Sequence, residues 1–542
     1  MDEKPLDNLL IKLGKWGKFQ LVYYLCLCLA VMYTVCQMSY IFTARDIKYR
    51  CFISECEKPS NTFNPDWLKD YVPFKNGLPN KCLYYERINE TCFSPLANQN
   101  STKTCNNFIY ERSETTIVHD FNIHCDNNLW KLTIVGTINV IGELICLSYS
   151  GFISDRFGKS RVMTISMLMS SCIGMIKSFS TSYTFFISLE FLETAFCSVT
   201  YGAAFILAME VVPSNQRNIG NIAISCIFTL GQILLGVVAS VTPNWRILLR
   251  CMYLPGLLSV SFFWLIPESL MWLIHQGKHE EAKKIILKIA RTNNTESNVD
   301  EESINNIIMK LNTNTDEADK EKETFLTAIQ NKTLLLRTIT CSYMWICCVF
   351  IYYGLTIHSV GITDNIYLSY IFTVSIEIPG FAVYYLIDDK IGRRKVMLVT
   401  LVLSGVFCFV DEYIPEEYFW CKLIGFLMGK CFITIAFAVL YVYTTEIFPT
   451  CARHSMFSLC SMFGRIGSIL APQVPLLARI SKSLPLFIFA ILAGTSGVLS
   501  LYLPETLNTK LPETVEEAVN IGKTKDLNFS SCNTVLLDQI KA

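Results

Sequence analysis

Four ionisable residues stand out inside the long apolar stretches of this chain: the carboxylates Glu143 and Glu377 and the cations Lys430 and Arg465. A charged side chain at the centre of a bilayer costs about 2.5 to 3.5 kcal/mol, so it usually faces a cavity or an opposite charge. Two carboxylates and two cations near mid-depth would suit a small molecule that carries both charges. The alternative is that they neutralise one another as structural ion pairs. Both carboxylates are also candidate sites for a coupled Na⁺ or H⁺.

Aromatic residues in the same stretches could complete such a site. Trp345, Tyr352, Tyr353 and Tyr441 are the candidates, because the face of an aromatic ring attracts a cation. The guanidinium of Arg465 could bind a carboxylate through two parallel hydrogen bonds. A single aromatic residue in a span is more often a packing residue, so the prediction applies to the group and not to each ring.

Long helices must position these residues, and the apolar stretches are long enough to span a membrane. Of the 542 residues, 51% are hydrophobic and 17% are charged, which is typical of a membrane protein. A span needs about 20 mostly apolar residues. Twelve stretches are expected to be spans: residues 19–42, 130–153, 162–179, 183–212, 218–241, 245–266, 337–357, 365–387, 396–410, 418–445, 454–478 and 484–503. The predicted fold class is an all-α membrane protein with twelve transmembrane helices.

Three short patterns occur twice in the chain, in the same order. Glu-x-x-Pro-x-x-x-Arg begins at Glu210 and again at Glu446, 236 positions later (446 − 210). An Asp, a base, an apolar residue, a Gly and a base begin at Asp155 and again at Asp389, 234 positions later (389 − 155). Pro-Glu-Ser at 267–269 is matched by Pro-Glu-Thr at 504–506. The sequence therefore predicts two pseudo-symmetric six-helix halves, an arrangement found in many transporters.

Positive charge in the short connections predicts the orientation of the chain. Lys and Arg gather before the first span, between spans two and three, and between spans eight and nine, so both termini and the central loop are expected in the cytoplasm. The expected division is a cytoplasmic N-terminus at 1–18, a first half at 19–266 with an extracellular loop at 43–129, a cytoplasmic central loop at 267–336, a second half at 337–503 and a cytoplasmic tail at 504–542. A multi-pass protein of the plasma membrane is predicted.

The extracellular loop has the composition of a disulfide-linked, glycosylated cap. It contains six cysteines, Cys51, Cys56, Cys82, Cys92, Cys105 and Cys125. An even number of cysteines in an oxidising compartment predicts disulfides, and six allow fifteen pairings among which the sequence does not choose. Asn89 and Asn100 each begin an Asn-x-Ser/Thr acceptor sequence for glycosylation.

Several classes of function are not expected. The other cysteines have no spacing typical of metal ligands, and Gly522-Lys523-Thr524 has Glu517 where a phosphate-binding loop needs its first Gly. No metal, cofactor or ATP is therefore predicted. No nucleophile is placed with a base, so an enzyme is not expected, and positive charge follows membrane edges instead of forming one basic face for nucleic acid. Two unequal sets of six spans suit a monomeric carrier in the lipid bilayer, whereas a channel needs a symmetric ring.

Two segments resemble a known family. Gly-Phe-Ile-Ser-Asp-Arg-Phe-Gly-Lys at 151–159 is similar to the loop signature of the major facilitator superfamily. Pro-Glu-Ser-Leu-Met-Trp-Leu at 267–273 resembles Pro-Glu-Ser-Pro-Arg-Trp-Leu of its organic ion branch, which includes organic cation, carnitine and organic anion transporters. Leu270 and Met271 depart from the usual Pro and Arg, which loosens one cytoplasmic contact. The resemblance covers nearly the whole chain and implies transport of small organic ions by alternating access.

The resemblance also bears on the substrate. Cation-type members place an acid where this chain has Arg465, whereas anion and carnitine types place an Arg in a context like Gly-Arg-Ile-Gly-Ser-Ile-Leu-Ala-Pro, here 464–472. The run 429–450 resembles the carnitine members, and Phe381 stands where anion members often carry a Lys. Organic cations or zwitterions such as carnitine are therefore expected. The alternatives are an organic anion transporter, or a membrane receptor or channel.

The charged residues of the repeated patterns lie at the cytoplasmic ends of predicted spans. They are Asp155, Arg156, Lys159, Glu210 and Arg217 in the first half and Asp389, Arg393, Glu446 and Arg453 in the second. Glu210 and Glu446 lie at the cytoplasmic ends of the fourth and tenth predicted spans, where they are expected to be near enough to pair with these bases across the bundle. The family resemblance implies that such pairs form a gate that closes the cytoplasmic side. The alternative is that the charges only anchor helix ends at the lipid headgroups.

Overall fold

The computed structural model describes most of the chain. The described residues are 13, 17–53, 56–57, 63–65, 67–75, 78–87, 97–212, 217–295, 328–361, 365–415, 417–450, 452–507, 509, 511–512 and 514–521. Among them, the first half of the bundle contains six helical segments. These are α2 (Lys18–Tyr33) continued by η1 (Thr34–Ser39) and α3 (Tyr40–Thr43), α6 (Leu129–Phe157), α7 (Lys159–Lys177), α8 (Tyr183–Val211), α9 (Arg217–Val241), and α10 (Trp245–Tyr253) continued by η4 (Leu254–Ser261) and α11 (Phe262–Leu265).

The second half repeats this arrangement. Its segments are α16 (Lys332–His358) with η7 (Ser359–Gly361), α17 (Ile366–Ser375) with α18 (Glu377–Ile391), α19 (Arg393–Tyr413), α20 (Phe419–Ile447), α21 (Arg453–Leu470) with η8 (Ala471–Gln473) and α22 (Val474–Ile480), and α23 (Leu484–Leu499) with η9 (Ser500–Tyr502). Within the described part of the chain, ten segments are long and apolar enough to cross a membrane. Of the twelve segments named above, α7 and α21–α22 do not meet this criterion of length and hydropathy. Both nevertheless pack against other helices of the bundle. The predicted all-α membrane fold is confirmed.

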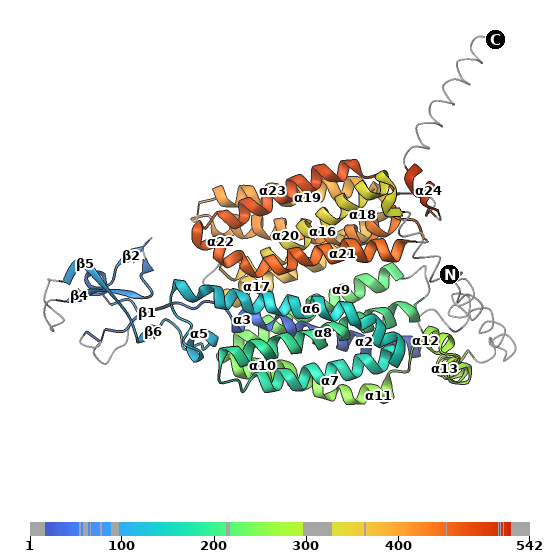
Figure 1. Cartoon of the computed structure of the whole chain (residues 1–542), viewed down its shortest axis with the longest axis horizontal. Helices are drawn as coiled ribbons and strands as arrows, with labels where there is room; N and C mark the ends of the chain where they lie inside the picture. Colours follow the sequence, from blue (N-terminus) through green and yellow to red (C-terminus); the bar gives the residue numbers. More distant parts are fainter. Residues whose placement is uncertain are drawn as a thin grey trace, which may run out of the picture.

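The two halves lie side by side and each has its own apolar core (Figure 1). One core extends from Tyr23 to Phe262 and Ile266 and also includes Tyr370 and Val374 of α17. The other extends from Ala328 to Ala518. The helix α17 therefore packs against the first half, where it contacts α9.

A proline interrupts the helix that carries Glu377. Pro379 has no N–H to donate to the carbonyl of Ser375, four residues earlier, and the helix divides at Ile376 into α17 and α18. Glu377 is consequently the first residue of α18. An acidic side chain is favourable at the N-terminus of a helix, where the backbone N–H groups are unpaired.

The segment between α3 and α6 contains three short antiparallel strand pairs. They are β1 (Tyr49–Cys51) with β6 (Phe108–Tyr110), β2 (Phe74–Lys75) with β3 (Leu78–Pro79), and β4 (Leu83–Arg87) with β5 (Ala97–Thr104). Short helices α4 (Leu68–Tyr71), α5 (Ile117–Asp120) and η2 (Asp126–Asn128) accompany them. Disulfides join Cys51 to Cys105 and Cys82 to Cys125, and Cys56 is also disulfide-bonded. The predicted disulfide-linked loop is confirmed. Cys92, Asn89 and the side chain of Asn100 lie outside the described residues.

The bundle has two different ends (Figure 1). The strands of the disulfide-linked segment project from one end, which we call the loop end. The short helices α12 (Leu270–His275), α13 (His279–Thr292) and α24 (Val515–Asn520) lie at the opposite end, which we call the motif end because the repeated charged patterns lie there. Residues expected on opposite sides of the membrane therefore lie at opposite ends of the bundle.

The helix α16 begins earlier than the predicted span. It begins at Lys332, upstream of Arg337, where the predicted span begins. Arg337 is only 8% exposed and donates a hydrogen bond to the carbonyl oxygen of Ala518 at the end of α24, at 2.6 Å. A cation is stabilised at the C-terminus of a helix. The sequence did not predict this contact because α16 and α24 are distant in the chain.

Candidate functional site

An ion pair joins the two halves near the middle of the bundle. Arg465 of α21 donates to Glu143 of α6 at 2.5 Å between Nη1 and Oε1. Their side chains are 25% and 18% exposed, so neither is sealed from the space between the helices. A small cavity of about 30 Å³ adjoins Glu143 and is also lined by Tyr353 and Ser468 of the second half. The pair therefore lies where a molecule between the halves could reach both partners.

A second ion pair is fully enclosed within the second half. Lys430 of α20 and Glu377 of α18 lie 2.9 Å apart, and their side chains are 0% and 1% exposed. The ammonium of Lys430 also donates to the carbonyl oxygen of Tyr352 at 3.1 Å and to Thr356 Oγ1 at 2.8 Å. It lies 3.4 Å from the centre of the Tyr352 ring. This lysine is surrounded by partners and has little room for a further ligand in this conformation.

The internal repeat relates two contacts between the halves. Thr229 of α9 donates to Glu377 Oε2 at 3.1 Å. Glu377 occupies the position in the second half that Glu143 occupies in the first. Thr229 and Arg465 are also equivalent, because they lie 236 positions apart (465 − 229), as do the first residues of α9 and α21. The ion pair between Arg465 and Glu143 is therefore matched, in the equivalent place, by a hydrogen bond from the neutral hydroxyl of Thr229 to Glu377. The four charged residues predicted from the sequence form two separate pairs.

The four predicted aromatic residues form one connected cluster. Trp345 contacts Tyr441 with ring centres 4.7 Å apart, and Tyr352 contacts Tyr353 at 5.2 Å. Phe437 joins the two pairs, because its ring lies 5.3 Å from Tyr352 and 5.2 Å from Tyr441. Trp345 and Tyr352 are buried, whereas Tyr441 is 41% exposed. Phe437 was missed from the sequence, although it precedes Tyr441 by one helical turn and so shares its face.

The aromatic cluster approaches the ion pair between the halves. Tyr353 and Tyr441 are electrostatic neighbours of the Arg465 guanidinium. The arrangement brings a cation, a carboxylate and exposed aromatic surface together at one place between the halves. Such a set can bind a carboxylate through the guanidinium and an alkylammonium through the ring faces and the acid.

A larger cavity of about 870 Å³ lies toward the loop end. Tyr40 and Gly136 of the first half and Ile357 and Pro472 of the second half line it together with charged residues of the disulfide-linked segment. Further contacts between the halves lie at this end. Thr133 of α6 donates to Gln473 Oε1 at 3.0 Å, and other polar contacts there include Arg479 with Asp126, Arg479 with Asp46 at 2.9 Å, and Gln473 with Thr137 at 2.7 Å. In this conformation the halves are joined toward the loop end.

At the motif end the three repeated patterns meet within each half. In the first half Glu210 accepts from Lys159 and from Ser269 Oγ, and Glu268 accepts from the backbone N–H of Ser160 at 2.9 Å. Two such contacts to one carboxylate fix the ends of α7 and α8 against the segment that follows α11. The patterns separated in sequence are therefore one structural unit.

The second half repeats this unit with its own residues. Glu446 accepts from Arg393 at 3.4 Å and from Thr506 Oγ1 at 2.5 Å, and Glu505 accepts from the backbone N–H of Arg393 at 2.9 Å. Gly392 has a φ of 99°, and an added Cβ there would lie 2.6 Å from Glu505. Only glycine adopts this conformation without strain and also leaves room for the acid.

The remaining predicted gating residues have less specific surroundings. Asp155 accepts hydrogen bonds from Trp272 and Gln276 through its backbone carbonyl, and the Arg156 guanidinium lies 5.6 Å from the Phe157 ring centre. Arg453 is the first residue of α21. The side chains of Arg217 and Asp389 lie outside the described residues. The described ion pairs of the motif end form within each half, and whether they act as a gate stays a prediction.

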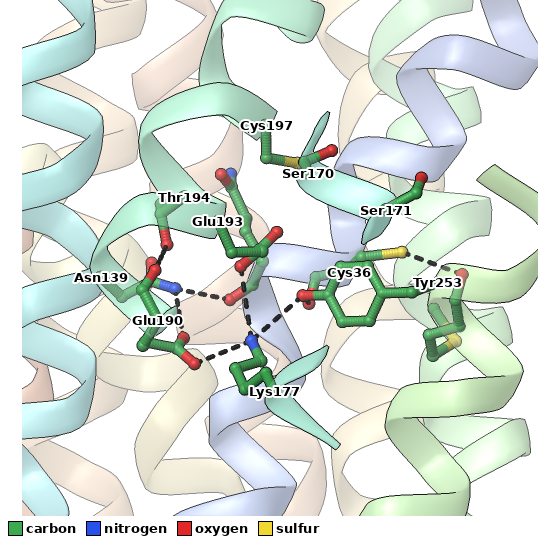
Figure 2. A network of polar contacts seen from close by, with 12 residues as sticks. Cys36, Asn139, Ser170, Ser171, Lys177, Glu190, Glu193, Thr194, Cys197 and Tyr253 are labelled. Carbon is green, nitrogen blue, oxygen red and sulfur yellow. Dashed lines mark hydrogen bonds and ion pairs between the residues drawn. The ribbon is translucent and has the colours of Figure 1, made fainter. Parts of the chain in front are cut away.

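A third group of buried charges was missed from the sequence. Lys177, Glu190 and Glu193 form a network in the first half (Figure 2). Lys177 falls in the predicted span 162–179, and both acids fall in 183–212. The rule that selected the four predicted residues applies equally to these three, because each is an ionisable group in an apolar stretch.

Comparisons with known proteins agree with this architecture. Residues 84–517 match the family model described as "Sugar (and other) transporter". Solute carrier family 22 member 2 of Mus musculus is 30% identical over 450 residues, which cover 81% of this chain and 80% of that protein. The organic cation transporter protein of Drosophila melanogaster is 28% identical over 529 residues, 95% of each chain. Organic cation/carnitine transporter 2 of Homo sapiens is 27% identical over 555 residues, 99% of this chain and 98% of that protein.

Solved structures show the same fold. The proton:xylose symporter XylE, described as a major facilitator superfamily protein, superposes with a TM-score of 0.59 at 14% identity and covers 91% of this chain and 98% of that one. A partially occluded inward-open form of XylE from E. coli also gives a TM-score of 0.59 over 73% of this chain and 94% of that one. The chain therefore belongs to the sugar (and other) transporter family of the major facilitator superfamily and, within it, to the organic ion branch.

Proposed function

We propose that this chain carries small organic ions across the plasma membrane by alternating access, and that organic cations or zwitterions such as carnitine are its substrates. Membership of the family makes the chain a multi-pass membrane transporter of small organic substrates and not an enzyme. The finer parts of the proposal are the substrate, the mechanism, the site residues, the sidedness and the monomeric state. They rest on the arguments that follow.

The observation that carries the proposal is the ion pair between Arg465 and Glu143. It connects the two halves, it is partly exposed, and it adjoins the aromatic cluster. A zwitterion can replace both partners at once, because its carboxylate can bind Arg465 while its ammonium lies against Glu143 and the ring of Tyr441. A simple cation would take Glu143 and leave the guanidinium without a partner, which is costly where water is scarce. The geometry therefore favours a substrate that carries both charges.

The same exchange supports alternating access. The substrate would separate Arg465 from Glu143 and so weaken a direct bond between the halves. The polar contacts of Arg479 and Gln473 join the halves toward the loop end in this conformation, and they would have to break when the site opens to that side. Rocking of one half against the other about a central site is the mechanism by which such repeats transport their substrates.

The relatives support the class of substrate. The names of two of them specify organic cations and, in one case, carnitine as well. We extend this chemistry to the present chain because Arg465, Glu143 and the aromatic cluster provide the groups that a quaternary ammonium with a carboxylate requires. The enclosed pair of Lys430 and Glu377 is proposed to stabilise the second half and to contribute to the site only in another conformation.

The proposed domain boundaries follow the same division. The first half is residues 19–266, the second half is residues 337–503, and the segments 1–18, 267–336 and 504–542 are proposed to be cytoplasmic. The described helix α16 begins upstream of 337, at Lys332. The disulfides in the segment 43–129 support its extracellular location, because disulfides persist in oxidising compartments.

Uptake by the purified protein in lipid vesicles tests the proposal. Carnitine, tetraethylammonium and an aromatic carboxylate would be compared at controlled membrane potential, with and without Na⁺. Saturable uptake of carnitine that exceeds uptake of the aromatic carboxylate is the expected result. Unlabelled carnitine preloaded inside the vesicles should accelerate the influx of labelled carnitine, because a carrier exchanges substrates and a channel does not. The absence of counterflow for all three compounds would overturn the proposal.

A further inference from the structure

The network around Lys177 contains more negative than positive charge. The ammonium of Lys177, the last residue of α7, lies 2.9 Å from Glu190 Oε2 and 3.4 Å from Glu193 Oε2, both on α8. Its third hydrogen bond goes to the Tyr253 hydroxyl of α10 at 3.3 Å. The side chains of Lys177, Glu190 and Glu193 are at most 1% exposed. With both acids ionised, this closed site would hold one uncompensated negative charge (Figure 2).

The two acids are not stabilised equally. Glu190 has partners on both oxygens, because Asn139 Nδ2 of α6 donates to its Oε1 at 2.8 Å. Glu193 has the longer contact to Lys177 and a side-chain interaction with the Tyr253 hydroxyl, while its Oε1 is buried without a hydrogen-bond partner among the described residues. An ionised carboxylate in a dry interior is unfavourable unless it is paired and hydrogen-bonded. Glu193 is therefore the group on which a proton would neutralise the site.

No other charged side chain of the described residues compensates Glu193. The titratable groups that face it from the packed elements are Lys177, Glu190, Tyr33, Cys36, Cys197 and Tyr253. The tyrosines and cysteines among them are neutral in their ordinary forms, and they bond mostly to backbone: Tyr253 donates to the carbonyl of Cys36 at 3.1 Å and Cys197 donates to that of Thr34 at 3.6 Å. A proton from outside the network would balance the charge.

The second half does not repeat the two acids. At the offset of 236 that relates α8 to α20, the counterparts of Glu190 and Glu193 are Phe426 and Gly429. The second half packs the same position of the same helix with an apolar side chain, and Phe426 is 2% exposed. The counterpart of Lys177, at the offset of 234 that relates α7 to α19, is the buried acid Asp411. The second half therefore keeps one buried ionisable group here but lacks the paired acids of the first half.

The network connects to the ion pair between the halves. Asn139, which binds Glu190, precedes Glu143 by four residues on α6 and so lies one helical turn from it. Both residues line the cavity of about 30 Å³ together with Gln37, and that volume exceeds the 10 to 15 Å³ that one water requires. A change of charge on the network therefore changes the electrostatic potential near Glu143, the carboxylate that pairs with Arg465.

We propose that Glu193, held beside Lys177 and Glu190, is a proton-binding site that couples proton movement to transport. The inference rests on the proposed function. In the conformation described here Glu193 carries the proton and the network is neutral. When the first half rearranges and water reaches the site, the Glu193 O–H bond breaks, the proton passes to water, and Lys177 rebinds a full carboxylate. One proton taken from water on one side is thus released on the other.

Infrared spectroscopy of the whole protein tests the proton without any transport assay. The wild type near neutral pH should show the carbonyl stretch of a buried protonated carboxylic acid, and Glu193→Gln should remove it. Glu193→Asp, which keeps a carboxyl group, should restore a band at a changed frequency, and this variant serves if the amide variant does not fold. A wild type without such a band, or a band unchanged in Glu193→Gln, would overturn the proposal.

Transport in vesicles tests the coupling with carnitine as the probe. An inward proton gradient or its reverse should change the initial rate of wild-type uptake by about 5-fold or more, the range of typical coupling between sites. Glu193→Gln should lose that response and still exchange carnitine in counterflow at equal pH. Glu86→Gln, an acid-to-amide change on β4 in the disulfide-linked segment, is the control and should respond like the wild type. An equal response of Glu193→Gln, or a response to Na⁺ alone, would overturn the inference, whereas loss of all counterflow by the wild type would overturn the proposed function.

Discussion

The guanidinium of Arg465 and the carboxylate of Glu143 lie 2.5 Å apart although 322 residues separate them in the chain. The repeat places Thr229 and Glu377 in the equivalent relationship, with a distance of 3.1 Å. One half thus contributes a cation where the other contributes a hydroxyl group. The centre of the pseudo-symmetric bundle is therefore asymmetric. Of these two equivalent residues, Arg465 of the second half can bind a carboxylate tightly, and Thr229 of the first half cannot.

Replacement of Arg465 by Ala should abolish the uptake of substrates that carry a carboxylate. Removing one partner of a partly buried charge pair costs about 2 to 5 kcal/mol, so uptake of carnitine at low concentration should fall by more than 10-fold. Uptake and surface abundance would be measured together in cells. Thr229→Val, at the equivalent position of the other half, is the matched control and should retain most uptake. Normal carnitine uptake by Arg465→Ala would contradict the proposed site.

The enclosed pair of Lys430 and Glu377 should show strong non-additivity in stability. Either Lys430→Met or Glu377→Gln leaves one buried group without its partner, and breaking a buried pair in this way costs about 3 to 5 kcal/mol. The double variant removes both charges and should be more stable than at least one of the single variants. Thermal unfolding in detergent measures the effect. Additive losses would indicate that the two side chains do not depend on each other.

Glu446→Gln should lower the turnover rate more than it lowers the affinity for substrate, if the ion pair with Arg393 takes part in gating. A hydrogen bond to a charged group contributes about 1.5 to 3 kcal/mol. Initial rates over a range of carnitine concentrations separate the maximal rate from the half-saturating concentration. Glu210→Gln provides the counterpart in the first half. Unchanged rates in both variants would favour the alternative that these charges only anchor helix ends.

Removal of the disulfide between Cys82 and Cys125 should destabilise the loop end. A disulfide of this span typically contributes about 2 to 5 kcal/mol. Cys82→Ser should therefore increase cleavage of the disulfide-linked segment by an added protease and lower surface abundance. The buried free Cys146 within α6 supplies the control, and Cys146→Ser should leave the cleavage rate unchanged. Equal cleavage of Cys82→Ser and the wild type would contradict the assigned pairing.

Asp120 should stabilise the loop end in a pH-dependent manner. Burial by itself would raise the pKa of Asp120, but hydrogen bonds from His119, Arg246 and Trp245 outweigh it and hold the pKa below the ordinary 3.8. A carboxyl whose pKa is lowered on folding adds stability at pH values above its ordinary pKa and loses that contribution as the pH falls through the folded value. Asp120→Asn should therefore unfold at a lower temperature than the wild type at neutral pH, and the difference should disappear in strong acid. A difference that persists there would indicate a cause other than ionisation.

The sequence was sufficient for the architecture because the architecture follows from hydropathy and repetition. Apolar stretches located the helices to within a few residues, and the equal offsets of the repeated patterns predicted two halves. The helix α16 begins at Lys332, upstream of the predicted span, and the hydrogen bond from Arg337 to α24 joins segments that the sequence does not place together. The cysteine pairing could not be chosen for the same reason.

The site was predicted only in part. The four charged residues selected from the sequence form ion pairs, which is one of the two interpretations considered for them. The sequence could not reveal that Arg465 pairs across the halves while Lys430 pairs within one. Lys177, Glu190 and Glu193 satisfy the same rule of charge in an apolar stretch, so the sequence signal for this network was present.

In each half, the contacts described above for the repeated patterns at the motif end stay within that half. This bears on how the protein could be synthesised. Glu210 finds its partners in residues 159–269, and Glu446 finds its own in residues 393–506. A break in the polypeptide between α13 and α16 would remove none of these bonds. Two separately translated fragments should therefore each reach a native-like bundle in the bilayer and reassemble through Arg465 and Glu143, as expected of a protein that descends from a fused pair of ancestral genes.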